Sequence, residues 1–342
     1  MFAVPPGCDR PTTRQRPKTN STPVSRRGFL ATTAAGLAVA QTVGPTGRPA
    51  AAEEKSSAQK RFDIHVHLAD AWYGSDRGPL TADMLLRWMD VHNIEQAAVL
   101  PLVSPEAFWY PVSTDSVIQR TRHHADRLIP FCAIDPRTLA THLTTHTQVV
   151  AMLRRYQDAG ARGFGEHKAL LPIDDPLNMK LYAACAEVGL PVLFHLDNRA
   201  NMDKPGLPGL ERVLKTHPDL KMIGHGKGWW ASIAGDLNQK DLHVGYPQGK
   251  VAPGGALDRL LAAYPNLYGD LSSSGAHAML RDPDFGRGFL RRHSGQLLFG
   301  TDYYDLTQKD FLQFGLFQQL PVGDDIEQAI CWTNARELLN LA

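Results

Sequence analysis

Eight short apolar segments, each followed by a segment with helical periodicity, constrain the fold of this 342-residue chain more than any other feature. The helical segments end in glycine or proline just before the next apolar segment, as at Gly189 and Pro191. Strands that alternate with helices in this way are parallel, because each helix carries the chain back across the sheet. The predicted strands cover residues 61–67, 95–101, 128–135, 162–167, 191–196, 220–225, 266–271 and 296–302.

Eight strand–helix units between residues 61 and 342 match a (β/α)₈ barrel in number and in size. We therefore predict an α/β fold, a (β/α)₈ TIM barrel that forms a single catalytic domain over residues 61–342. A doubly wound open sheet is the structural alternative. The sequence contains neither of the glycine-rich phosphate-binding motifs that would support it.

The first predicted strand ends in Asp63-Ile64-His65-Val66-His67. Side chains alternate along a strand, so His65 and His67 project from the same face. Two imidazoles on one face can bind one cation, and imidazole suits zinc, iron, nickel and copper. The alternative is a pair of histidines in a half-exposed strand.

Later strands also end in side chains that bind metals. In a barrel of this kind, the active site lies at the carboxyl ends of the strands. Four strand ends supply a histidine or carboxylate of ligand type, besides the opening pair, so the sequence predicts a metal site at the barrel mouth. The candidates are Glu166, His195, His225 and Asp302.

The same segments resemble the amidohydrolase superfamily, specifically the amidohydrolase-related group that includes aminocarboxymuconate-semialdehyde decarboxylase. The resemblance covers residues 61 to about 342. Its carriers are Asp63-Ile64-His65-Val66-His67, Leu190-Pro191-Val192-Leu193-Phe194-His195, Ile223-Gly224-His225-Gly226, Asn266-Leu267-Tyr268-Gly269-Asp270 and Phe299-Gly300-Thr301-Asp302.

The resemblance implies one or two divalent metal ions, commonly zinc, and a set of ligands. The ligands that match the family pattern are His65, His67, His195 and Asp302. His225 matches a position that is either a ligand of a second metal or an acid/base group. The fourth strand often carries a carboxylated lysine, whereas this chain has Glu166 there, as in TatD-type deoxyribonucleases. Glu166 is the predicted ligand, with a salt-bridged carboxylate beside the ligands as the alternative.

The family resemblance and the ligand types favour a metal-dependent hydrolase of an ester, lactone or amide. A cation can lower the pKa of bound water to about 7, and Asp302 could then act as the general base. The alternative within the family is a non-oxidative decarboxylase with one metal and His225 as acid/base. A binding protein that has lost catalysis and a TatD-like nuclease are weaker alternatives. Trp229 and Trp230, after the sixth strand, could line the substrate pocket or cover the barrel rim.

Residues 1–52 are predicted to be a signal peptide and linker. Ser25-Arg26-Arg27-Gly28-Phe29-Leu30 resembles the twin-arginine export signal, and the apolar run that follows is too short for a stable membrane span. We therefore expect an exported protein, periplasmic or secreted, with no stable membrane span after maturation.

The charges support a small-molecule substrate. Residues 1–52 carry seven of the 36 basic residues and one of the 35 acidic residues, so the rest of the chain is mildly acidic. A net negative charge on residues 53–342 argues against binding to nucleic acid, which usually requires a basic patch. The sequence leaves the oligomeric state open, and a homo-oligomer is compatible with it.

Overall fold

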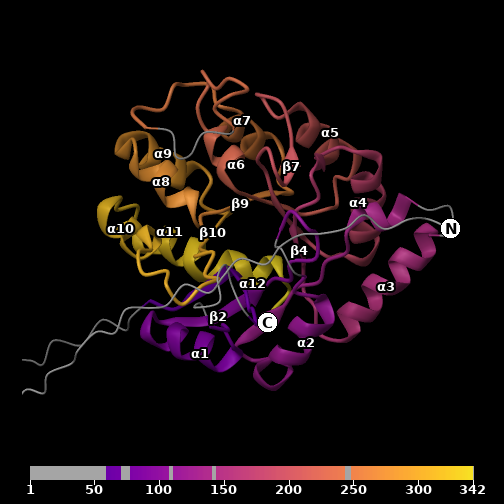
Figure 1. Ribbon diagram of the computed structural model, residues 1–342. Helices are drawn as coiled ribbons and strands as arrows, with labels where there is room; N and C mark the ends of the chain where they lie inside the picture. Colours follow the sequence, from indigo (N-terminus) through magenta and orange to yellow (C-terminus); the bar gives the residue numbers. More distant parts are fainter. Residues whose placement is uncertain (1–58, 71–77, 108–110, 141–143, 243–247, 342) are drawn as a thin grey trace, which may run out of the picture. The chain divides into compact units, whose positions relative to one another are not determined.

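Eight parallel strands form a closed barrel in the computed structural model, with helices around it (Figure 1). The structure describes residues 59–70, 78–107, 111–140, 144–242 and 248–341, all within the compact unit Lys55–Ala342. The predicted signal peptide and linker lie outside the described residues. The barrel strands are β1 (Arg61–Val66), β2 (Ile94–Val99), β3 (Leu128–Pro130), β4 (Phe164–His167), β6 (Val192–His195), β8 (Met222–His225), β9 (Leu267–Asp270) and β10 (Leu297–Leu298).

Two parallel sheets, joined at both ends, make up this barrel. One sheet has the order β1-β2-β3 and the other the order β10-β9-β8-β6-β4. Isolated parallel bridges pair Cys132 with Phe164 and Val66 with Tyr303 and so connect the sheets. The predicted TIM barrel is therefore confirmed, and the open doubly wound sheet is wrong.

All eight barrel strands are shorter than the sequence pattern indicated, and the third and eighth differ most. The third strand ends at Pro130 rather than at 135, and the eighth ends at Leu298 rather than at 302. After Leu298 the chain continues beside β1, where the Asp302 amide donates to the His65 carbonyl oxygen at 2.9 Å and Asp302 takes a left-handed conformation with φ of 58°. The apolar pattern continues into these loops because they too are buried.

The helices begin and end close to the proline, glycine and capping residues that the sequence offers as helix boundaries. In α4, the Asp175 carboxylate accepts a hydrogen bond from the Leu177 amide, Pro176 opens the helix, and Gly189 ends it in a left-handed conformation. The longer helices are α1 (Ala82–Val91), α2 (Thr114–Thr121), α3 (His146–Asp158), α4 (Pro176–Val188), α5 (Pro208–Thr216), α7 (Ala256–Ala263) and α9 (Pro283–Arg292). None of the helices in the described ranges is both long and apolar enough to cross a membrane.

Short elements occupy the loops and the C-terminus. The helices α6 (Lys227–Ala231) and α8 (Ser274–Leu280) follow β8 and β9 and lie beside the site. The others are β5 (Leu171–Pro172), β7 (Asn201–Met202), α10 (Leu316–Gln319), α11 (Asp324–Gln328) and α12 (Asn334–Leu338). The last of these, α12, packs Ala335 and Leu338 against an inner apolar cluster that includes Phe62 and Ile64 of β1.

Candidate metal centre

His65 and His67, at the end of β1, form the centre of the site. Both are buried, and their Nε2 atoms lie 3.1 Å apart. His65 Nδ1 lies 2.8 Å from the carboxylate of Asp270, and His67 Nδ1 lies 2.9 Å from the carbonyl oxygen of Leu100. Because both partners only accept hydrogen bonds, each neutral ring carries its proton on Nδ1 and presents a lone pair at Nε2. Two lone pairs that face each other at this distance need a positive charge between them.

The carboxylates of Glu166 and Asp302 approach this pair of nitrogen atoms. Glu166 Oε2 is 3.6 Å from His65 Nε2 and 3.4 Å from His67 Nε2. Asp302 Oδ1 is 3.7 and 3.6 Å from the same two atoms. Burial alone would lower the pKa of His65, but the charges of Asp302 and Glu166 raise it well above its ordinary value. The site therefore favours a cation at this place.

Lys168 lies beside Glu166 and balances its charge. Its ammonium nitrogen is 2.7 Å from Glu166 Oε2. Burial would raise the pKa of Glu166, but Lys168 and then His65 lower it well below its ordinary value. Glu166 is thus both a salt-bridged carboxylate and a neighbour of the paired imidazoles, which combines the two alternatives that the sequence left open.

His195, at the end of β6, joins a different part of the site from the one predicted. Its Nδ1 is 2.8 Å from Glu166 Oε1, and its Nε2 is 3.0 Å from Asp197 Oδ2. It forms a group of possible ligands with Glu166 and His225 rather than with the β1 pair. Sequence reasoning gave Asp197 no role, although it stands two residues after His195 and so has the same strand parity.

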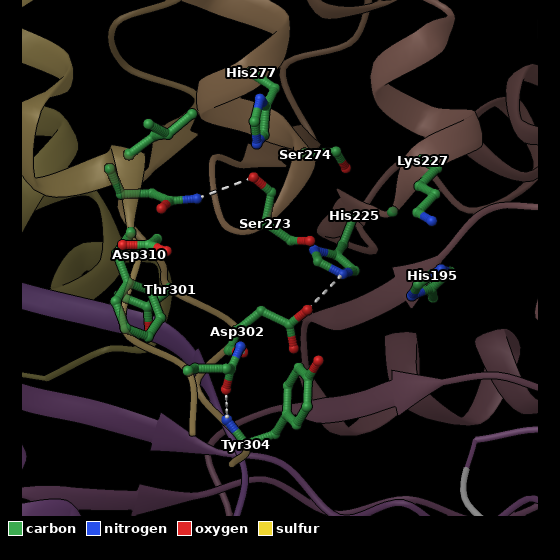
Figure 2. Close-up of a pocket in the computed structure, with 15 residues that line it drawn as sticks. His195, His225, Lys227, Ser273, Ser274, His277, Thr301, Asp302, Tyr304 and Asp310 are labelled. Atoms are coloured by element: carbon green, nitrogen blue, oxygen red, sulfur yellow. Dashed lines mark hydrogen bonds and ion pairs between the residues drawn. The ribbon is translucent and has the colours of Figure 1, made fainter. Parts of the chain in front are cut away.

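His225, at the end of β8, faces Asp302 across the pocket floor (Figure 2). Its Nε2 is 3.8 Å from Asp302 Oδ2. Its Nδ1 lies 2.9 Å from Ser272 Oγ and 3.0 Å from Asp270 Oδ2. Asp270 therefore holds the Nδ1 atoms of both His65 and His225, which fixes which nitrogen of each ring faces the site.

Asp63, the first residue of the β1 motif, joins the ends of the first and last strands. Its Oδ1 accepts hydrogen bonds from the backbone amides of His65 and Thr301, each at 3.0 Å. Its Oδ2 accepts a third from the Thr301 hydroxyl at 2.5 Å. Burial raises the pKa of Asp63 to about 7, despite these hydrogen bonds. The contacts place Asp302 opposite the histidines of β1.

Trp229 and Trp230 do not line the pocket, contrary to the prediction that they bind substrate. Their exposed fractions are 0% and 2%. The Trp229 ring packs edge-on against Phe194 with centroids 5.7 Å apart, and the Trp230 indole donates a hydrogen bond to the Asp270 carbonyl oxygen at 2.9 Å. Both turn inward from α6 and support the strands that carry the site residues.

A cavity of about 370 Å³ opens beside His195, His225 and Asp302 (Figure 2). Its walls come from the loops after β8, β9 and β10. The other lining residues are Gly226, Lys227, Ser273, Ser274, His277, Thr301, Tyr304, Gln308, Asp310, Phe311, Leu312 and Gln313. Such a volume suits a small-molecule substrate.

The donor set fits a divalent metal. Three groups of residues have ligand atoms that all lie within 4.8 Å of one another: His65, His67 and Glu166; His65, His225 and Asp302; and Glu166, His195 and His225. The second ring nitrogens of His65, His67 and His225 contact a carboxylate, a carbonyl or a hydroxyl, as is usual for histidines that bind metal.

A closed parallel barrel with these donors at its mouth defines a class, the metal-dependent (β/α)₈-barrel enzymes. The chain matches the amidohydrolase family over residues 62–341 and belongs to that family. None of the curated proteins compared with the chain matches it.

Solved structures of similar fold have low sequence identity. An uncharacterised TIM-barrel protein from Bordetella bronchiseptica is 20% identical, with a TM-score of 0.58 over 82% of this chain and 99% of that chain. A probable 2-pyrone-4,6-dicarboxylic acid hydrolase from Acinetobacter baumannii, with citric acid bound, is 14% identical, with a TM-score of 0.55 over 82% and 99%. A dihydroxybenzoic acid decarboxylase from Polaromonas sp. JS666, with bound manganese and the inhibitor 2-nitroresorcinol, is 16% identical, with a TM-score of 0.52 over 83% and 97%. These likenesses show the shared fold.

Proposed function

We propose that the protein is a metal-dependent, non-oxidative decarboxylase of a small carboxylic acid. The main support for this proposal is the contact between His225 and Asp302 on the pocket floor. Decarboxylation needs a proton donor next to the carbon that loses carbon dioxide, and His225 could serve as that donor. Hydrolysis of an ester, lactone or amide, which the sequence favoured, becomes the second candidate. Several structures of similar fold are aromatic-acid decarboxylases, whereas the likeness to the pyrone-dicarboxylic acid hydrolase supports the second.

The residues that would hold the metal are His65, His67, Glu166 and Asp302, with His195 beside Glu166. When bound, the metal supplies positive charge that stabilises negative charge on substrate oxygen atoms. We propose zinc, because two imidazole nitrogen atoms with two carboxylates are ligands of the types that zinc binds in proteins. Manganese is the alternative, since a decarboxylase of similar fold contains it.

In this proposal His225 carries the proton. Its Nδ1–H donates toward Asp270 and Ser272, so the proton for transfer is a second one, held at Nε2 of the imidazolium form, which faces Asp302 and the cavity. Burial lowers the pKa of His225, so the imidazolium gives up this second proton readily. The bond between the carboxylate and its carbon breaks, carbon dioxide leaves, and that carbon takes the proton. The reaction consumes one proton and releases one carbon dioxide, so it needs neither an oxidant nor a reductant. Asp302 then helps to return a proton from water to Nε2.

The decisive experiment follows the fate of two substrates in heavy water. We expect the metal-loaded protein to release carbon dioxide from 2,6-dihydroxybenzoate and to place deuterium on the carbon that lost it, as measured by mass spectrometry and proton NMR. Protein stripped with a chelator is the control and should be inactive until metal is restored. Ring opening of 2-pyrone-4,6-dicarboxylate, with no carbon dioxide from any carboxylic acid tested, would instead establish the hydrolase.

We further propose that the protein is exported by the twin-arginine route, on the basis of Arg26-Arg27 and the apolar run after them. Replacing both arginines with lysine keeps the charge but removes the paired guanidinium groups that define the signal. We expect the variant to remain in the cytoplasm as precursor, as measured by immunoblots of cell fractions. An unchanged periplasmic or secreted yield would contradict this prediction.

A further inference from the structure

A second cluster of buried polar side chains lies beside the metal centre, on β4 and on the segments that follow β4 and β6. Its members are His167 at the end of β4, Asn178 on α4 and Asn201 on β7, with exposed fractions of 2%, 0% and 0%. None of the three belongs to the groups of possible metal ligands found among the described residues. Buried polar side chains destabilise the folded protein unless they are hydrogen-bonded, so this arrangement needs an explanation.

The side chain of Asn201 connects the ends of two neighbouring strands. Its Nδ2 donates hydrogen bonds to the carbonyl oxygen of His167 at 2.7 Å and to that of His195 at 3.1 Å. Its backbone carbonyl oxygen accepts a hydrogen bond from the Asp197 amide at 3.0 Å. The ladder between β4 and β6 has its last pair at His167 and Phe194, so Asn201 adds a link beyond the end of that ladder.

Asn178 fixes the orientation of the Asn201 carboxamide. Its Nδ2 lies 3.4 Å from Asn201 Oδ1 and also donates to the Pro172 carbonyl oxygen at 2.8 Å. Its Oδ1 accepts a hydrogen bond from His167 Nε2 at 3.0 Å. Each N–H and each side-chain oxygen of the two carboxamides therefore has a partner, which favours a single arrangement of the cluster.

The two strand ends that Asn201 connects carry Glu166 and His195. Glu166 directly precedes His167, and its Oε1 lies 2.8 Å from His195 Nδ1. Its Oε2 lies 3.4 Å from Nε2 of His67 in the β1 pair. A side chain at a strand end follows its backbone, so a change in the spacing of the two ends would move Glu166 relative to both imidazoles.

We propose that Asn201 is a positioning residue of the metal centre, because its side chain fixes the spacing between the ends of β4 and β6 and thereby the place of Glu166. Its carboxamide bonds to two backbone oxygen atoms and to Asn178, so it acts on the metal only through Glu166 and His195. The inference rests on the metal site of the proposed function but not on the reaction, so it applies to a decarboxylase and to a hydrolase. Replacing residues that hold ligands in place typically costs about 10- to 100-fold in metal affinity or activity.

Cobalt(II) titration of protein stripped with a chelator tests this role, because the visible absorption of bound cobalt depends on the number and geometry of its ligands. Asn201→Ala removes both hydrogen bonds to the strand ends. We expect this variant to bind cobalt about ten-fold or more weakly than the wild type, with a changed absorption spectrum. Asn201→Leu keeps most of the side-chain volume without a donor. It should give the same result, and it replaces the alanine variant if that variant does not fold.

Asn178→Ala is the matched control. Asn178 is as buried as Asn201 and also loses hydrogen bonds on substitution, but its side chain does not bond to the carbonyl oxygen of His167 or of His195. We expect its unfolding midpoint to fall about as much as that of Asn201→Ala. Its cobalt affinity should stay within a few-fold of the wild type, and its spectrum should be unchanged.

Wild-type affinity and spectrum in the Asn201→Ala protein would overturn the positioning role. Equal changes in the two alanine variants would also overturn it, because they would indicate a general loosening of the fold. Wild-type protein that binds no cobalt would overturn the metal centre and this role together. Cobalt binding does not depend on the release of carbon dioxide, so the positioning role can fail while the decarboxylase stands, and the reverse also holds.

Discussion

Asp302→Asn should lower turnover by about 10² or more, the usual effect of losing an acid–base group, while leaving the fold nearly intact. The amide cannot accept a proton at neutral pH. Asparagine tolerates the left-handed conformation that Asp302 adopts, with φ of 58°, so the backbone should not be strained. The measurements are carbon dioxide release on the substrate identified above, metal content and the thermal unfolding midpoint.

Asp310→Asn is the matched control for this prediction. Asp310 lines the same cavity but belongs to none of the groups of possible metal ligands. Its turnover should stay within a few-fold of the wild type, because no metal or proton transfer depends on it. Near wild-type turnover in a fully metallated Asp302→Asn protein would reject Asp302 as part of the catalytic machinery.

The double substitution His65→Ala with His67→Ala should abolish metal retention. Purified wild-type protein should carry roughly one to two divalent ions per chain, because both Nε2 lone pairs face one point beside two carboxylates. Without the imidazoles, the ion would lose its nitrogen ligands from β1. Elemental analysis measures this loss and also distinguishes zinc from manganese.

His123→Ala with His124→Ala removes two histidines from the 3₁₀ helix after α2, outside the groups of possible metal ligands. This control should keep its metal and its unfolding midpoint. Full metal content in the His65/His67 variant would place the ion elsewhere and overturn the site. The variant should still fold when isolated, although Glu166 and Asp302 then lose the β1 imidazoles beside them, which should lower the unfolding midpoint.

Much of the fold and part of the site follow from the sequence. Strand parity and the position of active sites in barrels bring His65, His67, Glu166, His225 and Asp302 to one mouth, and the structure places these residues together. Each of them stands at or just after a strand end, where the direction of the side chain depends little on loop conformation. The convergence of these five side chains could therefore be predicted without knowing how the helices and loops pack.

Residues whose side chains depend on loop conformation could not be predicted. Trp229 and Trp230 stand in a short helix after β8, and the sequence does not show that this helix turns both rings inward. Likewise, Asp197 shares the strand parity of His195 but lies beyond the end of β6, so its contact with His195 Nε2 depends on the loop that follows.

The three hydrogen bonds of Asp63 determine when the metal centre can form during folding. They join the backbone of His65 to Thr301, a residue 238 positions away from Asp63 in the chain. Contacts between such distant residues form late, because the intervening chain must first be ordered. A growing chain has both β1 histidines early but gains the Asp302 carboxylate only when its last strand is made and docked. Tight capture of an ion thus reports that the barrel has closed, which makes metal content a measure of completed folding as well as of catalytic readiness.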